Sequence, residues 1–255
     1  MIGSVLLGSA FVGGTILITL MSYFFMRWIT GGGSDASERE LASSITVRIS
    51  ALHGLILALV FAQEMIEYQQ LKYESATEAD AIADVYYDAE RYGAAAQAAI
   101  QKSMSAYLKV VVEKEWDQLG STGELAQEGW VEWDNAYRAA LDLTPTTERQ
   151  KSLRDHMLSQ IQAIADTRVK RSNHSAGTIN TMFWFAALSG LILMALSYYP
   201  FRAERRSVLL IALFGAYTGI ILFLIYAFSN PYSRPAILSP AAYEHLQRQI
   251  SQPGN

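Results

Sequence analysis

The chain has 255 residues, of which 51% are hydrophobic and 17% are charged, and its formal net charge is −4. Its apolar residues are concentrated in a few long runs, which is typical of an integral membrane protein and argues against a soluble domain. The acidic balance argues against a nucleic-acid partner, and the lack of cysteine excludes disulfides, thiolate metal sites and cysteine nucleophiles.

Four apolar windows are long enough, or nearly so, for a membrane-spanning helix of about 20 residues. They cover residues 2–28, 47–66, 179–199 and 208–228. We therefore expect an all-α membrane protein with four transmembrane helices and a large helical extramembrane insert between spans two and three. The expected parts are 1–66 (spans one and two), 67–177 (the helical extramembrane domain), 178–229 (spans three and four) and 230–255 (a short C-terminal tail).

The first span carries small residues at the spacing of closely packed helices, for example Ser9-x-x-x-Gly13. Three glycines at 31–33 then break the helix. Ser37-x-x-Glu40 has the pattern of a capping box, which predicts the start of the next helix there.

The second span passes without a proline from an apolar run into a charged stretch, so we expect one continuous helix. Positions spaced alternately by three and four residues share one face of that helix. This face, which we call the stripe, runs from polar to apolar to acidic and consists of Ser50, His53, Leu57, Val60, Glu64, Glu67, Leu71, Glu74 and Glu78.

Copies of this helix packed around an axis would form a pore with His53 at one mouth. Leu57 and Val60 would form its constriction. Glu64 and Glu67 would line an acidic vestibule at the other end and favour cations.

A simpler interpretation exists for each part of this stripe. Glu64 and Glu67 would mark the point where the helix leaves the membrane, and His53 would be a hydrogen-bonded packing residue. The apolar middle fits a gate that excludes water and equally a packing face between helices.

The insert is predicted to be helical almost throughout, because apolar residues recur at helical intervals and no strand pattern is present. Thr144 followed by Pro145 has the pattern of a helix start. That helix runs towards the third span and carries Arg168, Lys170 and Arg171 near its end. These three residues are candidates for contacts with lipid phosphates or for pairing with acidic neighbours.

No motif for catalysis or metal binding is found in the sequence. The four histidines lack metal-ligand spacing, and there is neither a nucleophile elbow nor a phosphate-binding loop. Asp80, Asp84 and Asp88 lie one helical turn apart, and such a row either binds a divalent cation or is simply a solvated face. We expect no enzymatic activity, no cofactor and no metal.

The connection between spans three and four holds the densest positive cluster beside the membrane, formed by Arg202, Arg205 and Arg206. Gly215 and Gly219 then form a helix-packing motif in the fourth span. Because short positively charged loops remain in the cytoplasm, we place the first and third connections there. The acidic insert and both termini are then expected outside.

Three stretches resemble the bestrophin-like domain family of bacterial membrane proteins of unknown function. They are 78–86 (EADAIADVY), Tyr107 with Glu115–Trp116, and Asn230–Pro231–Tyr232 with Ser239–Pro240 and Tyr243. The resemblance covers nearly the whole chain. It implies a multi-pass protein of the bacterial inner membrane and kinship with bestrophins, which are oligomeric anion channels whose second membrane helix lines the pore. An insert outside the cytoplasm would depart from bestrophins, whose large domain is cytoplasmic.

We therefore expect a homo-oligomeric, bestrophin-like ion channel or channel-like membrane protein with the second span lining the pore, and with membrane lipid and inorganic ions as partners. The alternative is a structural or accessory membrane protein whose helical extramembrane domain binds another envelope protein or complex. That alternative predicts no conductance in pure liposomes.

Overall fold

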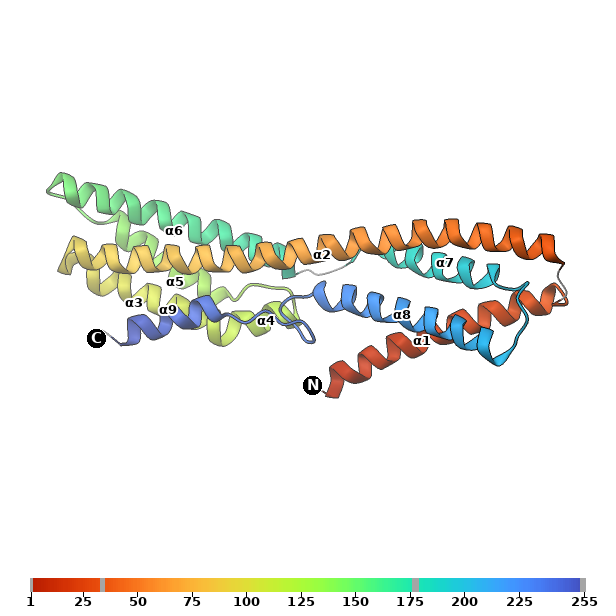
Figure 1. Cartoon of the computed structure of the whole chain (residues 1–255). Helices are drawn as coiled ribbons and strands as arrows, with labels where there is room; N and C mark the ends of the chain where they lie inside the picture. The colour runs from red at the N-terminus through yellow and green to blue at the C-terminus, as the bar shows by residue number, and fades with distance from the viewer. Residues whose placement is uncertain (1, 33–34, 176–178, 253–255) are drawn as a thin grey trace. The chain divides into compact units, whose positions relative to one another are not determined.

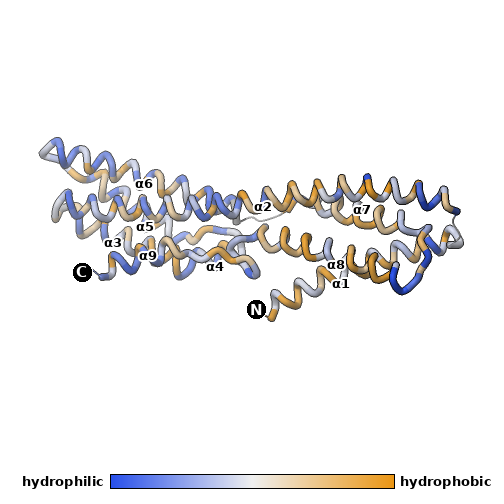
Figure 2. Tube along the Cα trace, viewed as in Figure 1, coloured by the Kyte–Doolittle hydropathy of each residue, from blue (hydrophilic) through white to orange (hydrophobic). Residues whose placement is uncertain are grey.

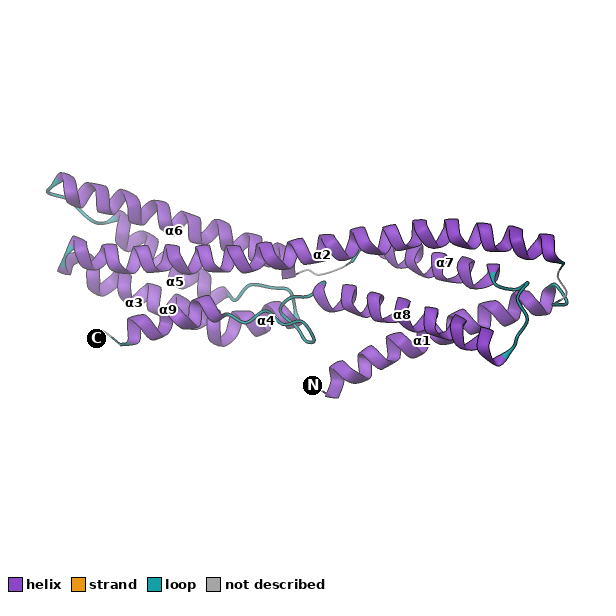
Figure 3. Cartoon of the chain, in the orientation of Figure 1, coloured by secondary structure: helices purple, strands orange, loops and turns teal. Residues whose placement is uncertain are grey.

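The computed structural model describes residues 2–32, 35–175 and 179–252, and all of its regular elements in these ranges are helical (Figure 3). The all-α fold class is confirmed. The helices are α1 (Ile2–Ile29), α2 (Ala36–Tyr92), α3 (Ala94–Val110), a π-helical turn (Val111–Glu115), α4 (Trp116–Ser121), α5 (Gln127–Leu141), α6 (Glu148–Ser175), α7 (Thr181–Ser197), α8 (Arg205–Phe228) and α9 (Ala241–Ser251) (Figure 1).

The chain divides into two compact units. We call residues 1–66 with 178–229 the apolar unit, and residues 67–177 with 230–255 the polar unit. Figure 2 shows the difference in hydropathy: apolar residues prevail along α1, the first part of α2, α7 and α8, whereas α6 is largely hydrophilic. Helix α2 contributes its first part to the apolar unit and the remainder to the polar unit.

Helix α2 is a single element of 57 residues. At a rise of about 1.5 Å per residue it is about 85 Å long. The Asp35 carboxylate caps its start by accepting a hydrogen bond from the Glu38 backbone N–H at 2.7 Å. The predicted capping residue, Ser37, lies instead within the first turn.

Three helices are both long and apolar enough to cross a membrane: α1, α2 and α8. The fourth predicted span corresponds to α7, which is apolar but has 17 residues. That is shorter than the about 20 residues that a perpendicular span requires. The described residues therefore contain three helices of spanning length and one shorter apolar helix.

Helices α1 and α8 pack closely because α8 has no side chain at two positions on its contact face. A Cβ at Gly219 would lie 2.8 Å from the Val12 Cα, and a Cβ at Gly215 would lie 2.8 Å from the Thr19 hydroxyl. Gly13 of α1 has open space around it instead. The glycine motif of α8 thus allows the close contact between α1 and α8, whereas Gly13 of the predicted Ser9-x-x-x-Gly13 motif lies outside this contact.

Helix α7 packs along the first part of α2. The hydroxyls of Thr46 and Ser197 lie 2.6 Å apart, and the Ser50 hydroxyl donates to the Met194 sulfur at 3.0 Å. Further along α2, Leu57 joins a buried cluster with residues of α7 and α8. Its other buried members are Phe183, Ala187, Leu222 and Ile225.

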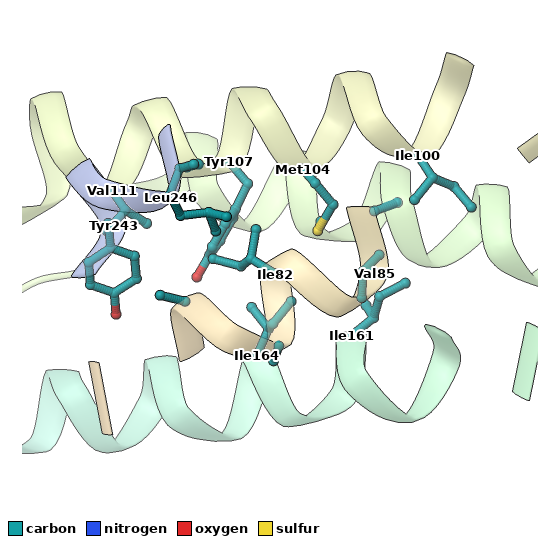
Figure 4. Packing of buried hydrophobic residues seen from close by; sticks show 14 of the residues in the cluster. Ile82, Val85, Ile100, Met104, Tyr107, Val111, Ile161, Ile164, Tyr243 and Leu246 are labelled. Atoms are coloured by element: carbon teal, nitrogen blue, oxygen red, sulfur yellow. The ribbon is translucent and has the colours of Figure 1, made fainter. Parts of the chain in front are cut away.

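The polar unit has a larger core, to which the second part of α2, helices α3 to α6 and α9 all contribute. Figure 4 shows ten labelled residues of this core, with Ile82 and Val85 of α2 lying among side chains from α3, α6 and α9. The predicted C-terminal tail is part of the core, since α9 inserts Tyr243 and Leu246 into it.

Candidate functional site

The stripe was the leading candidate for a pore surface, and the structure places its membrane part against the chain's own helices. His53 and Leu57 are buried, and Val60 is partly buried. The His53 imidazole occupies the space that a Cβ on Gly190 of α7 would need. Within one chain, these three side chains therefore contact α7 and α8 and do not face an open axis.

The two acidic residues of the predicted vestibule lie at the end of the apolar run. Glu64 belongs to the apolar unit and Glu67 to the polar unit, and both side chains are partly buried. They are accessible enough to contribute charge near the end of the span.

The opposite face of α2 is apolar and exposed within the apolar unit. Leu52, Leu55, Leu59 and Ile66 are each more than half exposed. Side chains of this kind lie against lipid or against another protein surface, because exposing them to water is unfavourable.

The acidic part of the stripe leads to a buried ionic cluster in the polar unit. This cluster consists of Glu78 from α2, Glu115 from the π-helical turn, and Arg168 and Arg171 from α6, all of them 0% exposed. Its two carboxylates and two guanidiniums balance in charge. Such a group is stable inside a protein only when its members pair and hydrogen-bond.

Glu115 is the centre of this cluster. Its carboxylate accepts hydrogen bonds from the Arg168 guanidinium, from Arg171 Nη2 at 2.6 Å and from the Ala126 backbone N–H at 3.0 Å. Arg171 also reaches Glu78, with Nε 3.2 Å from Oε2. The π-helical turn places Glu115 here by adding a residue to the helical turn, a distortion that is common where a side chain must be re-aimed.

Aromatic rings enclose the two guanidiniums. The Arg168 guanidinium lies 4.3 Å from the centre of the Trp130 ring, and that of Arg171 lies 5.4 Å from the Tyr243 ring. The Tyr107 hydroxyl donates to Glu78 Oε1 at 2.6 Å. Rings over a guanidinium replace part of the hydration that the cation loses on burial.

The environment shifts the proton affinities in this cluster. Burial raises the pKa of Glu78, and the Arg171 guanidinium and the Tyr107 hydroxyl offset part of that rise. Burial also opposes the charge on Arg171, but the carboxylate of Glu78, the Tyr243 phenol and the carboxylate of Glu115 outweigh it and raise its pKa. Arg171 therefore stays protonated.

Two of the three residues proposed for lipid phosphates thus lie inside the polar unit. Arg168 and Arg171 pair with carboxylates, whereas Lys170 is exposed on the surface of α6. The sequence did carry a signal for this arrangement. Arg168 and Arg171 continue the spacing of the apolar face of α6, formed by Met157, Ile161 and Ile164, so they occupy positions that point into the core.

The aspartate row on α2 does not form one group. Asp80 and Asp84 are exposed, while Asp88 is buried and bonds to Arg91 Nη1 at 2.8 Å and to His156 Nδ1 at 2.7 Å. Among the described residues, no three histidine or acidic side chains gather closely enough to hold a metal ion.

Comparisons with known proteins relate this chain to a protein family. A family model described as Bestrophin-like domain matches residues 13–243. The chain belongs to the Bestrophin-like domain family. The sequence resemblance is thereby confirmed over nearly the whole chain.

The fold of this bestrophin-like chain is also found among solved structures. A crystal structure of a bacterial bestrophin homolog from Klebsiella pneumoniae, carrying one mutation, superposes with a TM-score of 0.56. The match covers 94% of this chain and 96% of the homolog, at 10% sequence identity. At that identity the likeness concerns the fold. The comparison with curated proteins found no match.

Proposed function

We propose that this bestrophin-like protein is a homo-oligomeric, channel-like membrane protein in which α2 lines a pore for inorganic ions. The family membership and the fold support the proposal, and one structural observation carries it: the exposed apolar face of α2. The stripe of His53, Leu57 and Val60 already packs on α7 and α8, so contact between copies would use the opposite face of α2.

In this arrangement Leu52, Leu55 and Leu59 would form an apolar constriction around the axis. An apolar constriction gates ions by excluding water. Glu64 and Glu67 belong to the stripe, so they lie on a different face of α2 from these leucines. In this arrangement their partly exposed side chains would not form the constriction, but their charge beyond its end would favour cations.

The lack of native cysteine allows a direct test. We would reconstitute the full chain in liposomes and introduce Leu59→Cys or Leu57→Cys as the single cysteine. A charged, membrane-impermeant thiol reagent should modify Leu59→Cys and change the conductance. Leu57→Cys should not react, because that side chain is buried between helices of one chain.

The oligomeric state, measured by mass photometry, completes the test. A closed oligomer with a reactive Leu59→Cys supports the channel. A monomer without conductance, whose Leu59→Cys stays unreactive, contradicts it and leaves the accessory role, in which the polar unit binds another envelope protein. Glu64→Lys with Glu67→Lys should shift the reversal potential towards anions.

A further inference from the structure

A cavity of about 400 Å³ lies in the apolar unit, where the connection between α7 and α8 meets the end of α1 and the start of α2. Figure 2 shows this connection as a hydrophilic segment between apolar helices. The cavity is lined by Arg27, Gly32, Arg39, Pro200, Arg202, Ala203 and Glu204. Three arginines and one glutamate give this lining a formal charge of +2.

Arg27 is held in place by the backbone. Its Nη1 donates to the carbonyl oxygens of Phe201 at 2.8 Å and Tyr199 at 3.2 Å. The guanidinium lies directly on Gly32, where a Cβ would come within 3.1 Å of Cζ. Gly32 has φ +67°, a conformation that glycine adopts without strain. The turn therefore fixes a cation at the cavity wall.

The other two arginines are exposed, and Arg39 is oriented by a bond from its Nε to the Asp35 carbonyl oxygen at 3.2 Å. In the ranges that the structure describes, no carboxylate lies within ion-pairing distance of Arg27, Arg39 or Arg202. Three cations converge on one cavity, and its one carboxylate, Glu204, forms no ion pair with them, which is the arrangement of an anion site.

The start of α8 adds a second, independent feature. Glu204 precedes this 24-residue helix without capping it through its side chain, and the first turn holds Arg205 and Arg206 and no acidic residue. Positive side chains at the positive end of a helix dipole are unfavourable. An anion bound there would compensate the positive charge of Arg205 and Arg206 and that of the helix end.

The position of the cavity suggests what kind of anion it meets. Trp28, which is 79% exposed, and Phe25 lie at the end of α1 beside it. Exposed aromatic residues at the ends of apolar helices are typical of the headgroup level of a membrane. Basic pockets at that level bind lipid phosphates.

We propose that this cavity is a phosphate-binding site at the membrane boundary, and that the phosphate is carried by an anionic lipid headgroup or is free in solution. The bidentate N–H groups of Arg27, Arg39 and Arg202 would hold its oxygens. Glu204, the one acidic residue of the lining, would disfavour a ligand with a higher negative charge.

The test uses the full chain in a non-ionic detergent and two titrations by calorimetry. One ligand is dioctanoyl phosphatidylglycerol and the other is inorganic phosphate. Arg39→Gln with Arg202→Gln should weaken binding about 30-fold, because each arginine near such a site contributes about fivefold in affinity. Arg48→Gln, an exposed arginine of α2 outside the cavity, should change binding less than twofold.

The two titrations separate the sources of the phosphate. Binding of the lipid with no measurable binding of inorganic phosphate identifies a headgroup site, and comparable binding of both identifies a site for the free anion. Arg39→Lys with Arg202→Lys should restore most of the affinity, which distinguishes lost charge from lost folding. The proposal is overturned if neither ligand binds, or if the double glutamine variant and Arg48→Gln behave alike.

Discussion

At the scale of single residues, the polar unit depends on Glu115. Among the described residues, Glu115 is the one carboxylate that pairs with Arg168, whereas Arg171 pairs with both Glu115 and Glu78. A buried ion pair contributes little to stability compared with an apolar pair of the same size, but removing one partner leaves a buried charge without compensation. The cluster is therefore a strong constraint on which fold is stable.

Replacing this carboxylate gives a direct prediction. Glu115→Gln should lower the free energy of unfolding by about 3–5 kcal/mol, since the buried Arg168 guanidinium would lose its carboxylate partner and Arg171 would keep only Glu78. Thermal and chemical unfolding of the full chain in detergent would measure the change. Glu113→Gln is the matched control: its side chain is 54% exposed, and its loss should cost less than about 0.5 kcal/mol. Equal effects of the two substitutions would contradict the central role of Glu115.

The buried tyrosines around the cluster predict a pH dependence. Burial is the main cause that raises the pKa of Tyr107, and the negative charge of Glu78 raises it further. Burial also raises the pKa of Tyr232 and of Tyr243. A pKa raised by folding means that these phenols stabilise the fold fully below about pH 10, the value in the unfolded chain. That stability is lost as the pH rises through the higher value of the folded chain.

Phenolate absorbance during an alkaline titration measures this behaviour. The native chain should show a late phase that coincides with unfolding, and Tyr243→Phe should reduce the amplitude of that phase. Tyr73→Phe removes a side chain that is 73% exposed and should leave the late phase unchanged. If all tyrosines ionise in one early phase while the fold persists, the enclosure of these phenols is disproved.

At the scale of helices, the contact between α1 and α8 is sensitive to an added methyl group. Gly219→Ala would bring a Cβ to 2.8 Å from the Val12 backbone, so the helices must separate. Such overpacking costs about 1–3 kcal/mol. The melting temperature in detergent should fall accordingly.

Gly13→Ala is the control for this substitution, because that position on α1 has open space. Alanine favours a helix over glycine by up to about 1 kcal/mol, so this variant should be as stable as the native chain or slightly more stable. A similar loss of stability in both variants would mean that the α1–α8 contact is not the cause.

Helix starts show how far local sequence signals reach. The glycine break and the following helix were predicted, but the capping residue of α2 is Asp35, two residues before the predicted Ser37. Likewise α6 is capped by Thr147, whose hydroxyl accepts from the Gln150 N–H at 3.1 Å, and not by Thr144. Several nearby residues can accept the same bond, and the tertiary position of the helix selects among them.

At the scale of the whole molecule, the sequence predicted the all-α class and the family, because these follow from hydrophobic periodicity and from the spacing of distant motifs. It did not predict which surface the stripe faces. A face buried against neighbouring helices of one chain and a face buried between copies have the same three-and-four spacing, so one sequence cannot separate them. His53 against Gly190 shows which of the two applies within the chain.

The spacing of α6 indicated that Arg168 and Arg171 occupy core positions, but their partners could not be predicted, for a related reason. Charged residues at core positions look like breaks in an apolar pattern when each helix is considered alone. Glu78, Glu115 and Arg168 become interpretable only when their helices are placed together, because each charge is neutralised by a residue more than 50 positions away. Pairing across such distances carries no local signature.

The polar unit consists of two chain segments that are not synthesised consecutively. Residues 67–177 and 230–255 form it, and the segment between them contains α7 and α8. Tyr243, which packs over Arg171, is synthesised about 70 residues after it, or roughly 4 to 15 s later at ordinary translation rates. During that interval the nascent chain has its ionic cluster uncovered while two further apolar helices are made. The core of the polar unit can therefore be completed only after α7 and α8 have been synthesised, and a chain that stops before α9 would leave this core without Tyr243 and Leu246.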